Sequence, residues 1–78
     1  MSMSATDLRE LFAIAFQPSI VANADLLAKM FDGVASTLVI HKVSEARIKR
    51  AAEAVGLNHM AVTVLLQYVR SEQLSQTF

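Results

Sequence analysis

The chain has no cysteine and only two glycines. Without cysteine there can be no disulfide bond, no thiol catalysis and no cysteine-ligated zinc or iron–sulfur site. With so few glycines there is no glycine-rich loop to bind phosphate through its backbone N–H groups. The serines and threonines lie outside any nucleophile motif such as Gly-x-Ser-x-Gly. We therefore expect no enzymatic activity, no small-molecule substrate and no cofactor.

Metal ligands are scarce as well. The two histidines, His41 and His59, have no cysteine beside them, so a metal site would need carboxylates from elsewhere in the chain. His41 follows one expected helix and His59 begins another, and both positions are typical of surface residues. We expect no metal site.

Long apolar runs and a net charge are also lacking. No run approaches the roughly 18 apolar residues that a membrane-spanning helix needs. The short apolar segment from Leu11 to Phe16 follows an acidic region and ends near Pro18, which is not typical of a signal peptide, so we expect a cytoplasmic protein. Seven basic and seven acidic residues cancel. This balance disfavours a dedicated nucleic-acid-binding protein, because such a protein has to neutralise phosphates.

What the chain does have is an excess of apolar residues. Hydrophobic residues make up 54% of it and charged residues 18%, against about 45–50% and about 25% in typical soluble domains. Its 78 residues allow a single domain, residues 1–78, which would bury only about 60–65% of its unfolded surface. Because one small domain does not easily hide so much apolar surface, we expect a protein partner, most simply a second copy.

Apolar residues recur at helical spacing along most of the chain, and capping residues mark the helix starts. The capping residues are Ser4, Asn23, Ser44 and Asn58. The pattern predicts four helices, which cover Ala5–Phe16, residues 24–40, Glu45–Val55 and residues 59 to about 74. Since the joining segments are short, we expect an all-α fold in which the four helices form a compact bundle.

In one segment, Thr37 to Ile40, a strand competes with a helix, because the segment contains several β-branched residues. No second strand candidate exists to pair with it, and a lone strand would leave its backbone groups without hydrogen bonds. We interpret the segment as the end of the second helix, although the pattern alone leaves residues 37–43 open to either conformation.

The second expected helix carries an apolar row with the 4-3-4 spacing of a coiled-coil seam. The row consists of Leu27, Phe31, Val34 and Leu38. We expect it to be the surface that meets a partner. The leading hypothesis is a small non-enzymatic interaction or regulatory protein, homodimeric or part of an assembly, that acts by burying this helix face.

Residues 48–67 support an alternative hypothesis. Ala52 lies four residues before Gly56, Val55 and Leu57 flank that glycine, and further apolar residues follow at helical spacing. This segment resembles the helix-turn-helix element of small phage and bacterial regulators. The resemblance implies a corner at Gly56 and a second helix that lies in the major groove of DNA.

The resemblance also implies which side chains would face DNA. On the fourth expected helix one polar face could meet bases, and two cations on the third could hold phosphates. The residues are Lys49, Arg50, Asn58, His59, Thr63, Gln67 and Arg70. The same fourth helix has an apolar arc of roughly 240°, which instead predicts a mostly buried helix. A basic cluster at and before the third helix could equally meet an acidic partner, phosphate or membrane headgroups, or only solvent. It consists of Lys42, Arg47, Lys49 and Arg50.

Overall fold

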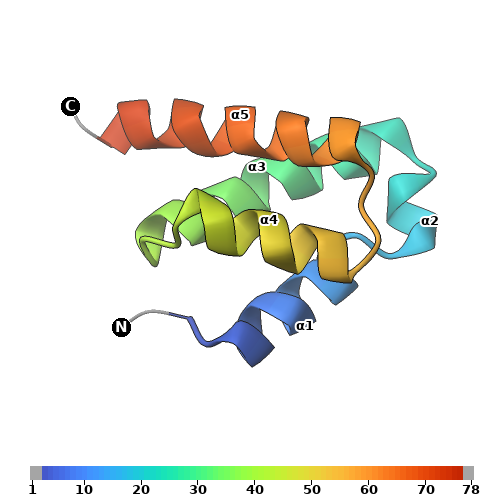
Figure 1. The fold of residues 1–78 in the computed structure, drawn as a ribbon. Coiled ribbons are helices and arrows are strands. Elements are labelled where there is room, and N and C mark those ends of the chain that lie inside the picture. The colour runs from blue at the N-terminus through green and yellow to red at the C-terminus, as the bar shows by residue number, and fades with distance from the viewer. Residues whose placement is uncertain (1–2, 77–78) are drawn as a thin grey trace.

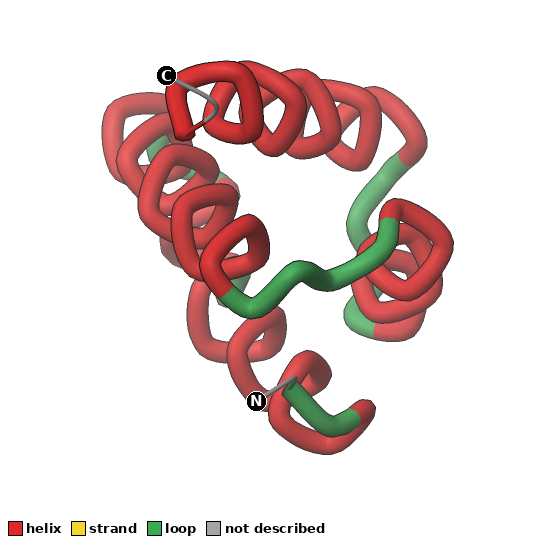
Figure 2. Tube along the Cα trace, turned by 90° about the vertical axis from the view of Figure 1, so that its left-hand side faces the viewer, coloured by secondary structure: helices red, strands yellow, loops and turns green. Residues whose placement is uncertain are grey.

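The computed structural model describes residues 3–76, and this part of the chain is built from helices joined by short loops (Figures 1 and 2). The helices are α1 (Ala5–Ala15), α2 (Pro18–Val21), α3 (Ala24–Ile40), α4 (Glu45–Ala54) and α5 (His59–Gln76). The predicted all-α class is confirmed, with no strand among these residues. The segment between the first two expected helices is the one-turn helix α2, which starts at Pro18 because proline suits the first helical position.

Side chains cap the helices where the sequence predicted. The Ser4 hydroxyl accepts the Asp7 N–H at 3.1 Å, and the Asp7 carboxylate accepts the Ser4 N–H at 3.3 Å, so α1 begins with a capping box. The Asn23 side chain caps α3, Ser44 caps α4, and Asn58 accepts the Ala61 N–H at 2.8 Å. These bonds satisfy backbone donors that have no partner within their helix.

The segment with two expected conformations is helical. Helix α3 continues to Ile40 and closes in a turn in which the Val43 N–H donates to the Leu38 carbonyl at 3.0 Å. Lys42 takes a left-handed conformation with φ 56° in this turn. The other left-handed residue is Gly56, at φ 85° between α4 and α5, where glycine is favoured because it has no Cβ.

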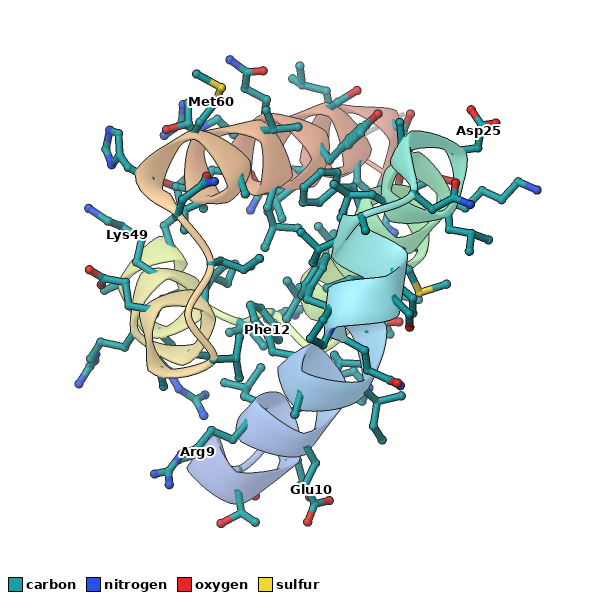
Figure 3. All side chains as sticks on the ribbon, turned by 90° about the vertical axis from the view of Figure 1, so that its right-hand side faces the viewer. Arg9, Glu10, Phe12, Asp25, Lys49 and Met60 are labelled. Carbon is teal, nitrogen blue, oxygen red and sulfur yellow. The ribbon has the colours of Figure 1, made fainter. Side chains whose placement is uncertain are left out.

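One core lies between the helices, and Figure 3 shows Phe12 pointing into it. Sixteen hydrophobic residues are buried there, and the part of the chain that the structure describes contains no buried polar or charged residue. An aromatic path crosses the core from Phe12 and Phe16 on the first helical segment to Phe31 and Tyr68, with successive ring centroids 5.5–5.7 Å apart. Such edge and tilted contacts add to the free energy of apolar burial.

The apolar row expected to meet a partner lies in this core instead. Phe31, Val34 and Leu38 are buried within the single chain and Leu27 is half-buried. Most of the row is therefore covered by the chain's own helices in this fold. Its coiled-coil spacing is used internally, because α3 packs along α5.

The expectation of a mostly buried fourth helix was also wrong. Only Val62, Leu65, Leu66 and Val69 of α5 are buried, and Met60 is 76% exposed. The apolar arc of α5 is wider than the contact that the other helices make with it. Apolar side chains are therefore left on the surface.

Candidate interaction surfaces

Helix α1 lies between two grooves, one shared with α3 and the other with α4. Its core face carries Leu8 and Phe12, both buried. At 100° per residue, Leu11 and Ile14 fall on one flank of that face and Arg9 falls on the other. The two flanks therefore differ in chemistry, apolar toward α3 and cationic toward α4.

The α1–α3 groove is an apolar hollow of about 250 Å³. Buried Ala15 and Val34 lie at its floor, and Ile14 stands at its edge with 65% of its surface exposed. Gly33 is also part of the lining, and a Cβ added there would meet no atom within 4 Å. The remaining lining residues are Leu11, Met30 and Thr37.

The groove continues into a row along the outside of α3, which we call the outer row. Its members follow one another at spacings of 4, 3, 4 and 3 residues and fall within an arc of about 80°. They are Leu26, Met30, Gly33, Thr37 and Ile40. Leu26 and Ile40 are exposed, and the Thr37 hydroxyl donates to the Gly33 carbonyl at 3.1 Å, which turns its methyl group rather than a free hydroxyl outward.

The α1–α4 groove, of about 450 Å³, combines an apolar floor with a cationic edge. Leu8 and Ala51 are buried at its floor. Arg9 leaves α1 on this side, as Figure 3 shows, and Arg47 and Arg50 come from α4. The exposed side chains of Ala5 and Ala54 complete the lining, which contains no acidic residue.

One of these arginines is held in place. The Arg47 guanidinium donates from Nη2 to the Met3 carbonyl at 2.7 Å and is half-buried. This bond ties the segment before α1 to α4. In the described part of the chain neither Arg9 nor Arg50 forms an ion pair, whereas Arg70 pairs with Glu45.

The residues expected to face DNA are all exposed. His59, Thr63, Gln67 and Arg70 share one face of α5, while Lys49 and Arg50 lie on α4. Three of the seven are already engaged. The Thr63 hydroxyl donates to the His59 carbonyl at 3.0 Å. Asn58 caps α5, and the Arg70 guanidinium donates from Nε and Nη2 to both Glu45 carboxylate oxygens at 2.9 Å.

This ion pair shifts the pKa of both partners. The hydrogen bonds from Arg70 hold the pKa of Glu45 below its usual value, and the same bonds raise the pKa of Arg70. The pair joins the start of α4 to the second half of α5, across the corner at Gly56. In this conformation the Arg70 guanidinium is occupied by a carboxylate, so a phosphate or base would have to displace Glu45.

Sequence reasoning missed both grooves. Arg47 and Arg50 were grouped with their neighbours in the chain, and nothing in the spacing links them to Arg9 on another helix. The outer row did carry a signal, the same heptad-like spacing as the core row, displaced by one residue along α3. Spacing alone does not tell which of two such rows faces the core.

Metal and membrane sites do not emerge from the described residues. The described residues include no group of three or more His, Asp or Glu side chains placed to hold a metal ion. They also include no helix that is long and apolar enough to cross a membrane. Comparison of the chain with protein-family models, curated proteins and solved structures gave no match.

Proposed function

We propose that this chain is a non-enzymatic interaction protein that self-associates through the outer row of α3 and the adjoining α1–α3 groove. The observation that carries the proposal is the continuity of this apolar surface. It runs along one helix and into a hollow on the next, and no other part of the described chain covers it. Scattered apolar residues are ordinary on a protein surface, but a continuous row is typical of a docking site.

The geometry of the outer row favours another helix as the occupant. Spacings of 4 and 3 residues keep a row facing a partner helix along its length. At its centre, Gly33 and Thr37 are small and allow two helix backbones to approach closely. Nothing within 4 Å occupies the space over Gly33.

The charges favour a second copy of the chain as the source of that helix. Lys29 flanks the outer row, Asp32 lies further round the same side of α3, and both are exposed. A two-fold contact places the same patch on both partners, so a patch that carries both signs can be complementary to itself. The chain has no net charge, so two copies do not repel one another at long range.

The size of the chain sets what a stable interface would have to cover. A stable interface buries about 800 Å² on each partner, roughly one sixth of the 5135 Å² surface of the chain. By the scaling of unfolded surface with mass, the single chain buries only about 58% of its unfolded surface. This fraction is slightly below the 60–65% expected from its length, and it leaves apolar area for a partner.

The test is light scattering on two matched variants. Ile14 at the groove edge and Leu74 on α5 are both 65% exposed, so Ile14→Glu and Leu74→Glu introduce the same charge at equal burial. We expect the first variant to be monomeric at concentrations where the wild type and Leu74→Glu form dimers. Thermal melts check that both variants fold. A wild type that stays monomeric at all concentrations, or equal loss of dimer in both variants, would contradict the proposal.

A second candidate function is DNA binding by α4 and α5. The observation that favours it is the exposure of all seven residues assigned to that role. The candidate is tested by fluorescence anisotropy with random duplex DNA at two salt concentrations, because phosphate-dependent binding weakens steeply with salt. Changing Gln67 and Arg70 to alanine is expected to abolish binding and leave the oligomer intact. Absence of binding at low salt would eliminate this candidate.

A further inference from the structure

The α1–α4 groove gathers positive charge on a protein that has none overall. Three of the chain's four arginines line it, and none of the lining residues is acidic. Figure 3 shows Glu10, the neighbour of Arg9, pointing away from α4. Asp7 is used in the capping box of α1. Neither of these two carboxylates of α1 therefore neutralises the positive charge of the groove.

The shape of the groove restricts what can fill it. Its floor, Leu8 and Ala51, is apolar, and the alanines beside the floor, Ala5 and Ala54, are short. A partner backbone can approach these alanines closely. The alkyl tail of a lipid would lie over a shallow floor and remain in water, and nucleic acid offers no apolar side chain to such a floor.

The spacing of the cations matches a helix. Arg47 and Arg50 are three residues apart on α4, which corresponds to a rise of about 4.5 Å. Two carboxylates three or four residues apart on a second helix have a similar separation. Arg9 stands across the groove from them on α1. Arginine suits such a site because its planar guanidinium binds a carboxylate through two parallel hydrogen bonds.

From these observations we propose that the α1–α4 groove binds an acidic, alanine-rich helical segment of another protein. Carboxylates of the segment pair with Arg9, Arg47 and Arg50, and its small side chains cover Leu8 and Ala51. The Arg47–Met3 hydrogen bond orients one of the three guanidinium groups before the partner arrives. The site is distinct from the self-association surface, which lies on the opposite flank of α1.

The probe is a fluorescein-labelled peptide of Glu-Ala-Ala-Glu-Ala-Ala-Ala repeats, which places its carboxylates on one helical face. The matched peptide has glutamine at every glutamate position. Anisotropy titrations are expected to show binding of the acidic peptide that weakens with salt, and much weaker binding of the glutamine peptide. If both peptides bind equally, or if duplex DNA at the same ionic strength binds as tightly as the acidic peptide, the proposal fails.

Matched variants locate the site. Lys49 lies next to Arg50 but leaves α4 on the side away from α1 (Figure 3). We expect Arg9→Gln and Arg50→Gln each to weaken peptide binding about fivefold to tenfold, and Lys49→Gln to change it less than twofold. An equal effect of Lys49→Gln would mean unspecific attraction and would overturn the proposal. Circular dichroism verifies that these exposed substitutions leave the fold intact.

Light scattering on the same variants separates this proposal from self-association. Arg9→Gln and Arg50→Gln are expected to leave the oligomeric state unchanged. Loss of the dimer in these variants would make a second copy the occupant of the groove and would refute a separate acidic partner. A wild type that is monomeric and still binds the peptide would refute self-association but would support the acidic partner.

Discussion

The two glycines give the sharpest prediction, because the same substitution at each has opposite expected effects. A Cβ added at either position would meet no atom within 4 Å. Steric crowding is therefore removed as a factor, and only the backbone differs. Gly33 lies inside α3 with ordinary helical angles, whereas Gly56 has φ 85° in the turn before α5.

The magnitudes follow from this backbone difference. Alanine at an exposed helix position stabilises by about 0.5–1 kcal/mol relative to glycine. Alanine in a left-handed conformation is destabilised by roughly 1–2 kcal/mol. With an unfolding entropy of about 2.1 cal/mol/K per residue, 1 kcal/mol corresponds to about 6 °C for a chain of this length. We expect Gly33→Ala to raise Tm by about 3–6 °C and Gly56→Ala to lower it by about 6–12 °C.

The assay is thermal unfolding followed by circular dichroism, at a protein concentration where light scattering shows monomer. Two variants that shift Tm in the same direction would refute the backbone reasoning. At high concentration the Gly33→Ala gain is expected to shrink, because the added methyl group would lie where we propose that the outer row meets its partner. An undiminished gain in the dimer would place Gly33 outside the interface.

Two further predictions concern the core and the ion pair. Ile48 is fully buried and Ile40 is 63% exposed. We therefore expect Ile48→Ala to lower the free energy of unfolding by about 2–4 kcal/mol and Ile40→Ala to lower it by less than about 1 kcal/mol, as measured by urea unfolding. Equal losses of stability in the two variants would contradict the assigned core. Arg70 lowers the pKa of Glu45 in the folded state below the usual glutamate pKa of 4.5. The stabilisation of the fold by this ion pair is therefore fully present above pH 4.5. It is lost as the pH falls through the lower pKa of the folded state. Glu45→Gln is therefore expected to be less stable than the wild type at neutral pH but not in acid. The difference is expected to be small because both side chains are exposed. A difference in stability that persists at low pH would contradict this role of the ion pair.

The helices and their caps could be predicted because their signals are local. Ser4 and Asp7 are three residues apart, and Gly56 directly follows the last turn of α4, so each signal lies within a few residues of its effect. The one-turn helix α2 was missed because Pro18 is both a helix stop for the residues before it and a suitable first helical residue. The pattern was interpreted only in the first sense.

The surfaces could not be predicted because they depend on which helix faces pack together. Phe31 in the core row and Met30 in the outer row are adjacent in sequence and belong to rows of the same spacing. Only the packing of α3 against α5 places the first inside and leaves the second at the edge of a groove. The approach of Arg9 to Arg50 depends in the same way on the packing of α1 against α4. Long-range contacts of this kind have no signature in spacing.

The proposed association is separable from folding. The core is closed by one chain and holds no polar group that awaits a partner in the described residues. The apolar excess from which a protein partner was predicted is divided between a complete core and the exposed outer row. A partner that binds only the outer row adds its binding free energy to a monomer that is already folded, so the dimer population and the apparent stability depend on concentration. The expected consequence is a monomer–dimer equilibrium in the wild type. The Tm of Ile14→Glu is then independent of protein concentration and nearly equal to the Tm of the wild type at high dilution.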